Sequence, residues 1–196
     1  MLNKLVRKLT EALVSNQYIS SEEREQYVYA MESMVESMIT LSSIIMIAIV
    51  ANVLLETIGF LVFFLGLRKR TGGYHLNQFW KCYVGTILIY VLIYIISSLN
   101  FNMVILYVFS GIASMIIFVI GSVNHPEMDW DTEELSETKS CARYILCMEL
   151  MVVFFLIILD ADIKLITYFL LAIIVCSILL LAAKISGQEV KINEKV

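Results

Sequence analysis

Charged residues are scarce in this chain, and their scarcity argues against an ordinary soluble domain. Only 16% of its 196 residues are charged, whereas about a quarter of a soluble globular domain usually is. Apolar residues take their place: 60% of the chain is hydrophobic, and the mean hydropathy is +0.84. Positive charge is not in excess either, since the net charge is −4. A negative net charge argues against a nucleic-acid partner. The composition therefore predicts an integral membrane protein.

The long apolar runs lack the alternation of apolar and polar residues that a membrane-spanning barrel needs. They are apolar on every face, and four of them are long enough to cross a bilayer as helices, since about 20 helical residues cover about 30 Å. The chain also has a single proline, no periodic repeat and no low-complexity linker. We therefore predict an all-α fold, a polytopic helical membrane bundle, forming one domain over residues 1–196.

Residues 1–15 lack the uninterrupted apolar core of a cleavable signal peptide, so we expect none. Leucine and valine recur there at helical spacing, and the basic residues Lys4, Arg7 and Lys8 lie on the other side. This pattern predicts an amphipathic interfacial helix at an anionic membrane surface. A helix packed against the rest of the protein would show the same pattern, and the sequence does not separate the two.

Four apolar runs in the second half of the chain predict transmembrane helices. These runs are Phe79–Ser98, Met103–Gly121, Ala142–Leu159 and Ile163–Ala183. Earlier, residues 38–67 form one apolar run that only Asn52 and Glu56 interrupt. As one helix it would be about 45 Å long, too long for one upright span and short for two. We favour a break near Asn52, which gives about six membrane-associated helices, although no Gly or Pro marks the turn.

Lysine and arginine gather in alternate connectors between the predicted spans. Residues 68–82 are strongly basic, Lys139 and Arg143 flank the end of the connector over residues 122–140, and lysines follow the last span. The connectors between them are uncharged or acidic. Because Lys and Arg favour the cytoplasmic side, we predict that residues 68–82, the loop over 122–140 and the C-terminus face the cytoplasm.

The segment over residues 68–82 also holds the residues with reactive chemistry, His75 and Cys82. On one continuous helix these two would lie about 10 Å apart along the axis, whereas a nucleophile and its base must come within about 3 Å. Gly72 and Gly73 supply the freedom to fold back. Near a helix start and among basic residues, Cys82 would be favoured as a thiolate. A buried apolar cysteine and a topology-marking basic cluster fit the spacing as well.

The run Arg-Lys-Arg-Thr-Gly-Gly-Tyr-His over residues 68–75, with Cys82 after six intervening residues, resembles the core signature of the accessory gene regulator B family. These are bacterial membrane endopeptidases of peptide quorum sensing. Weaker similarity covers Glu22-Glu23-Arg24, Tyr29-Ala30-Met31-Glu32, and the loop with His125-Pro126. The chain's size and its hydrophobic layout also match those of the family.

The resemblance implies a cysteine endopeptidase that cleaves the acidic C-terminal tail from a short amphipathic precursor peptide. Cys82 would be the nucleophile that forms an acyl-enzyme, and His75 the general base. The acyl group would then pass to a thiol or hydroxyl of the peptide, giving a thiolactone or lactone. Family members need the residues that match Arg68 and Gly73. The enzyme would lie in the bacterial cell membrane as a homodimer, with its active site facing the cytoplasm.

Other residues are assigned supporting roles or none. A basic cluster suits an acidic tail, so Lys69, Arg70 and Gly72 join Arg68 as supporting residues. Glu56 is a polar group inside an apolar run, which marks either function or a contact between helices. The other three cysteines are most simply apolar core. We expect no cofactor and no metal, because the histidines and cysteines lack the spacing of zinc ligands.

The competing interpretation is a non-enzymatic membrane protein, such as a small transporter or a peptide-export partner. Transporters usually carry internal repeats or matched polar residues at mid-membrane, and neither is clear in this chain.

Overall fold

The computed structural model describes residues 2–16, 18–20, 24–72, 79–99, 102–124 and 130–187. Within these ranges every regular element is an α-helix. The helices are α1 (Leu2–Ser15), α2 (Arg24–Val50), α3 (Leu54–Thr71), α4 (Phe79–Ser98), α5 (Met103–Ile120), α6 (Thr132–Ile158) and α7 (Ile163–Ile185). Five of them, α2 and α4 to α7, are long and apolar enough to cross a membrane. The predicted all-α polytopic bundle, with six helices after α1, is confirmed.

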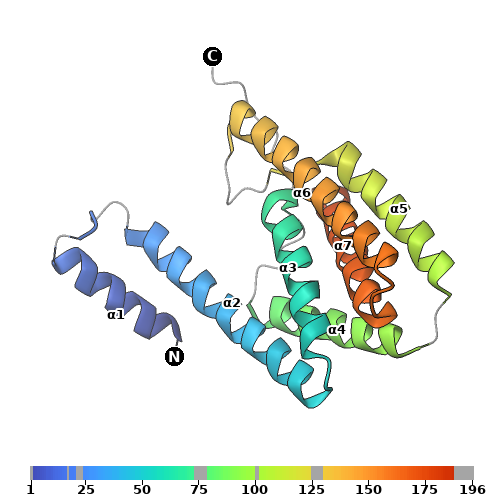
Figure 1. The fold of residues 1–196 in the computed structure, drawn as a ribbon. Helices are drawn as coiled ribbons and strands as arrows, with labels where there is room; N and C mark the ends of the chain where they lie inside the picture. Colours follow the sequence, from blue (N-terminus) through green and yellow to red (C-terminus); the bar gives the residue numbers. More distant parts are fainter. Residues whose placement is uncertain are drawn as a thin grey trace.

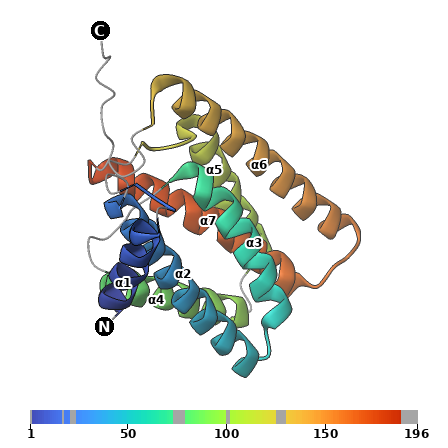
Figure 2. The same cartoon turned by 90° about the vertical axis from the view of Figure 1, so that its left-hand side faces the viewer.

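Helix α7 is the centre of the bundle. Its residues from Ile166 to Ile173 are all buried, which a helix with a lipid-facing side would not show. Helices α3 and α5 pack along it, and Figure 1 shows α7 behind α6 and between these two. Phe63 of α3 stacks on Phe169 with ring centroids 4.2 Å apart, and Gly59 lacks a side chain where the same ring lies. In Figure 2, α2 and α6 lie on opposite sides of α3 and α7.

The apolar run over residues 38–67 is broken at Ala51–Val53, as predicted, and the two halves are α2 and α3. Asn52 turns the chain with a φ of 58°. The backbone N–H of Asn52 donates to the Ile49 carbonyl at 3.1 Å, and the backbone N–H of Val53 donates to the Ala48 carbonyl at 2.9 Å. This pair of hydrogen bonds is a Schellman motif, in which Asn tolerates the left-handed conformation that Gly usually supplies. In the sequence, Asn52 is therefore the residue that marks the turn.

Helix α6 begins earlier than the sequence suggested. We predicted a loop over residues 122–140, but residues 132–140 are helical. The Asp131 carboxylate accepts the amides of Glu133 and Glu134, and the Glu134 carboxylate accepts the amide of Asp131 at 3.2 Å. This is a capping box, the arrangement that satisfies free amides at a helix start. The pattern Asp131-x-x-Glu134 in the sequence is therefore the signal for this helix start, and the predicted loop ends at it.

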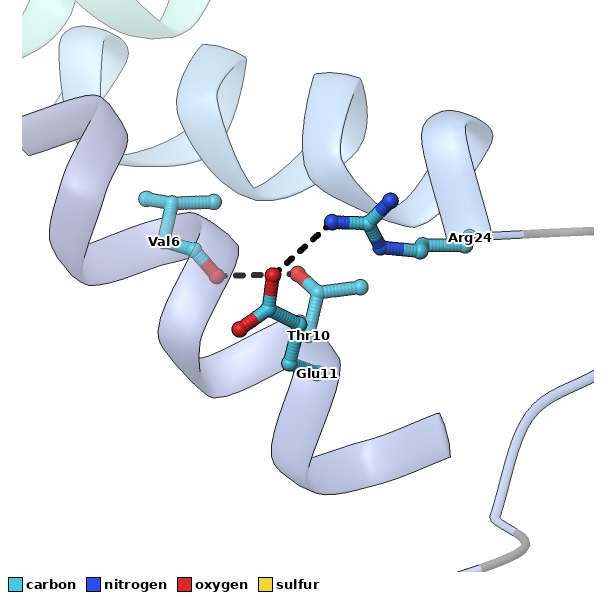
Figure 3. Close-up of polar contacts among 4 residues, drawn as sticks. All are labelled: Val6, Thr10, Glu11 and Arg24. Atoms are coloured by element: carbon cyan, nitrogen blue, oxygen red, sulfur yellow. Dashed lines mark hydrogen bonds and ion pairs between the residues drawn. The ribbon is translucent and has the colours of Figure 1, made fainter. Parts of the chain in front are cut away.

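Helix α1 packs on the first half of α2, and Figure 1 shows this pair standing out from the other helices. The face of α1 toward α2 is shielded from solvent, because Val6 and Thr10 are buried there. Near the C-terminal end of α1, Glu11 Oε1 lies 3.0 Å from Arg24 Nη2 of α2. Within α1, the Thr10 hydroxyl donates to the Val6 carbonyl (Figure 3). An exposed ion pair of this kind contributes only about 0.2–1 kcal/mol. One face of α1 thus packs against the protein, and the place of its other face at a membrane surface stays a prediction.

Candidate functional site

The basic segment bends where the sequence predicted. Helix α3 ends at Thr71, and Gly72 has φ 67° and ψ −147°, a conformation that costs other residues strain. Gly72 is buried, and a Cβ on it would lie 2.9 Å from the Val123 carbonyl oxygen. Glycine is therefore required here both for its φ and for its lack of a side chain. Gly73 and His75 lie outside the residues that the structure describes.

Arg68 points back into the bundle from the last turn of α3. Its Nη1 donates to the Gly72 carbonyl at 2.6 Å, so the side chain holds the bend that follows its own helix. Burial lowers the pKa of Arg68, and the nearby thiols of Cys176 and Cys82 oppose that shift. Arginine stays protonated in proteins even so. A half-buried positive charge thus lies near the thiol of Cys82, which comes from a different helix.

A short stretch after α5, residues 121–124, closes over the end of α3. The Val123 amide donates to the Thr71 carbonyl at 3.1 Å, and the Ser122 hydroxyl donates to the Arg70 carbonyl at 2.6 Å. These two carbonyls are among those that a helix end leaves without partners. All four residues of the stretch are buried. This contact could not be predicted from the sequence, since a residue that binds backbone leaves no side-chain pattern.

Cys82 lies in the first turn of α4, as predicted, and is half-buried. The neighbouring Tyr83 hydroxyl donates to Ser43 Oγ of α2 at 3.0 Å, and Tyr90 lies 2.6 Å from the Thr57 hydroxyl of α3. These hydrogen bonds fix α4 against both helices of the first hairpin. Cys82 lies at the N-terminal end of this fixed helix, which is the positive end of the helix dipole.

The remaining predicted site residues separate into two groups. Lys69 and Arg70 are exposed on the last turn of α3, available to a ligand in water or at the membrane surface. Glu56 lies in the first turn of the same helix, near the neutral phenols of Tyr90 and Tyr168. It lies twelve helical positions before Arg68, or about 18 Å away along the axis. The structure thus brings Arg68, Gly72 and Cys82 together and places Glu56 elsewhere.

All four cysteines are free thiols, and they differ in burial. Cys176 is buried in α7, where its thiol donates to the Phe64 carbonyl at 3.5 Å. Cys147 is exposed on α6, so its assignment to the core was wrong, and Cys141 is half-buried. No three His, Cys, Asp or Glu side chains of the described residues lie close enough to share a metal ion. Both histidines lie outside those residues, and the absence of a metal stays a prediction.

These features define a polytopic helical membrane protein with a cysteine at a helix start near a half-buried arginine. The family comparison gives this class a name. The family model for accessory gene regulator B (AgrB) matches residues 6–182, and the chain belongs to this family, which processes quorum-sensing peptides. No curated protein and no solved structure matches the chain. The resemblance carried by residues 68–82 thus extends over nearly the whole chain.

Proposed function

We propose that this protein is a membrane cysteine endopeptidase that shortens and cyclises a quorum-sensing precursor peptide. The Cys82 thiolate attacks the scissile carbonyl carbon, the C–N bond breaks, and the N-terminal part of the peptide stays on Cys82 as a thioester. His75 takes the proton from the thiol and gives it to the leaving amine. A thiol or hydroxyl of the peptide then attacks the thioester, which releases a thiolactone or lactone and restores the Cys82 thiol.

The observation that carries this proposal is the proximity of Arg68 and Cys82 in the fold. Fourteen positions separate them in the sequence, and they belong to different helices, yet the Cys82 thiol is an electrostatic neighbour of the Arg68 guanidinium. A nearby cation and a helix start are the surroundings in which reactive cysteines are found. A cysteine that served only as apolar filling would need neither.

The basic cluster supports the substrate class. Arg68 is half-buried near the thiol, while Lys69 and Arg70 are exposed on the same turn. Charge-assisted hydrogen bonds from such a cluster suit the carboxylates of an acidic peptide tail. We propose that the tail is held here while the bond that precedes it is cleaved.

The charge distribution supports a cytoplasmic site in the bacterial cell membrane. The Ser122 and Val123 hydrogen bonds place the end of α5 beside the basic end of α3, and α3 and α7 run in the same direction, toward Lys184. The turn at the other end of α7 carries Asp160 and Asp162. Lys and Arg favour the cytoplasmic side, so we propose that the basic end faces it. A homodimer stays a prediction.

The test is precursor length, measured by mass spectrometry after co-expression with a short amphipathic peptide that has an acidic tail. Cys82→Ser and His75→Ala should leave the precursor intact, whereas the matched control Cys147→Ser, on an exposed position of α6, should shorten it as the wild type does. Shortening by both site variants would refute the peptidase. Failure of the wild type to shorten any such peptide would favour the transporter interpretation.

A further inference from the structure

A short strap, residues 121–124, runs from the end of α5 across the end of α3. The Ser122 hydroxyl and the backbone N–H of Val123 donate to carbonyls in the last turn of α3. The Val123 carbonyl oxygen lies 2.9 Å from the place where a Cβ on Gly72 would be. A shift of the strap would therefore move the bend that follows α3, or leave carbonyls at this helix end without partners.

The Gly72 carbonyl at this bend is an acceptor for Arg68. Arg68 Nη1 donates to it at 2.6 Å, and the Thr71 hydroxyl donates to it at 3.2 Å. A hydrogen bond from a charged donor is shorter and stronger than one between neutral groups. The direction of this one carbonyl therefore helps to set where the Arg68 guanidinium lies.

Asn124 joins the strap to the start of α6. Its side-chain Nδ2 donates to the Trp130 carbonyl at 2.9 Å, and the backbone N–H of Trp130 donates to Asn124 Oδ1 at 3.1 Å. Only 2% of the Asn124 surface is exposed. An Asn side chain can donate and accept at the same time, as these two backbone groups require. A buried polar side chain whose nitrogen and oxygen both have partners favours a single conformation.

The other end of the strap also lies against α6. The backbone N–H of Gly121 donates to the Ile117 carbonyl at 2.7 Å, and its φ of 73° turns the chain out of α5. A Cβ on Gly121 would lie 2.8 Å from Lys139 Cγ of α6, so the two segments are in close contact. Helix α6 thus meets the strap at both ends, while the middle of the strap binds α3.

The start of α6 does not need Asn124 as a cap. Asp131 and Glu134 form the capping box of this helix, and the Asp131 carboxylate accepts its first free N–H groups. Trp130 precedes the capping residue, so its N–H and its carbonyl belong to the connector between α5 and α6. The two hydrogen bonds of Asn124 therefore fix the path of the connector, of which the strap is the first part.

We propose that Asn124 is a positioning residue for the candidate site. Asn124 holds the strap to α6, the strap holds the bend at Gly72, and the Gly72 carbonyl holds the Arg68 guanidinium. Without the Asn124 side chain, the strap moves away from α3 and Arg68 loses a fixed acceptor. The consequence for catalysis rests on the proposed function, but the position of Arg68 does not.

The first test is the rate at which phenylglyoxal modifies Arg68 in the full-length protein in detergent, followed by peptide mass spectrometry. Asn124→Ala should make Arg68 several-fold more reactive relative to Arg7, an exposed arginine on α1. Asn124→Asp keeps an acceptor for the Trp130 N–H and loses the donor to its carbonyl, so Arg68 should again be more reactive than in the wild type. Asn124→Asp decides the matter if Asn124→Ala does not fold. Wild-type reactivity of Arg68 in the folded variant would overturn the proposal.

Asp131→Ala is the matched control, because it weakens the same end of α6 and leaves the contacts of the strap in place. It should lower Tm and leave Arg68 as unreactive as in the wild type. If Asp131→Ala raises the reactivity of Arg68 as much as Asn124→Ala does, Asn124 merely stabilises the start of α6. That result would refute a positioning role.

Ser122→Ala tests whether the effect passes through the strap. It removes the hydrogen bond to the Arg70 carbonyl, so Arg68 should become more reactive here too. Changes that act through one shared element are not additive, whereas independent changes add. The double variant Ser122→Ala/Asn124→Ala should therefore label Arg68 little faster than the stronger single variant. Fully additive effects of the two changes would contradict a path through the strap.

Activity separates this proposal from the proposed function. In Asn124→Ala, KM for the precursor should rise more than kcat falls, because Arg68 is no longer held in place for the tail, and Asp131→Ala should keep the wild-type KM. Faster labelling of Arg68 in Asn124→Ala, with a wild type that shortens no precursor, would support the positioning role and refute the peptidase. Unchanged labelling with a working peptidase would refute only the role of Asn124.

Discussion

Gly72 shows, at the scale of single residues, how little freedom the site has. Its carbonyl accepts from Arg68, its φ is positive, and the Val123 carbonyl oxygen occupies the place of a side chain. Helix arithmetic on His75 and Cys82 predicted the bend at this glycine. It did not predict Val123, because a contact made by backbone atoms leaves no trace in the residue types.

Gly72→Ala should therefore damage both stability and activity. A non-glycine residue in this region of φ and ψ carries about 1–3 kcal/mol of strain, and the clash with Val123 adds to it. We expect a lower Tm in detergent and less precursor shortening. Gly111→Ala, in an exposed helical position without close neighbours, is the control and should not lower Tm, since Ala favours a helix more than Gly does.

Arg68→Lys should weaken substrate binding although it keeps the charge. Lysine offers a point charge and lacks the planar fork with which Arg68 reaches the Gly72 carbonyl. We expect a higher KM for the precursor and a lower Tm, because the hydrogen bond that holds the bend is weakened. Arg143→Lys replaces an arginine that donates to the Phe118 carbonyl on another part of the surface, so its KM should equal that of the wild type. Equal KM values for both variants would contradict a role of Arg68 in binding the tail.

At the scale of elements, the turn between α2 and α3 depends on the backbone conformation of Asn52. Replacement by Gly removes the cost of a positive φ, and replacement by Val raises it, because β-branched residues are genuine outliers there. Asn52→Gly should keep or raise Tm, and Asn52→Val should lower it by an amount that corresponds to about 1–2 kcal/mol. A lower Tm for Asn52→Gly would mean that the Asn side chain, and not its φ, is what the turn needs.

The start of α6 depends on Asp131. Asp131→Ala removes the acceptor for the amides of Glu133 and Glu134, a loss that usually costs about 0.5–2 kcal/mol. Hydrogen exchange should become faster over residues 132–138 and stay the same in the membrane part of the helix. Glu137→Ala, an exposed change on the same helix outside the cap, should leave these amides as protected as before.

At the scale of the whole molecule, the number of helices was predictable and their arrangement was not. Apolar runs of sufficient length can only be helices in a bilayer, which gave the six helices and the boundaries of α4 and α5 closely. The central position of α7 could not be predicted from the sequence, because α5 is about as apolar as α7 and yet far less buried. Lipid and protein interior select for the same residues, so composition does not separate them.

The candidate site was predictable where its residues follow one another in the chain. Residues 68–82 contain the bend, the basic cluster and Cys82, and their order alone suggested a site. Cys176 approaches Arg68 from a helix far along the chain, so only the fold reveals it. Glu56 shows the opposite error, since it is close in sequence to the site and lies at the other end of α3.

The central claim is that Cys82 forms a covalent bond with the peptide. The most direct measurement is mass spectrometry of the purified protein, quenched in acid during turnover of the precursor. The account predicts a peptide containing Cys82 whose mass is increased by that of the N-terminal part of the precursor, absent in Cys82→Ser and present in Cys147→Ser. Shortened precursor without any such adduct, produced equally by Cys82→Ser, would contradict it.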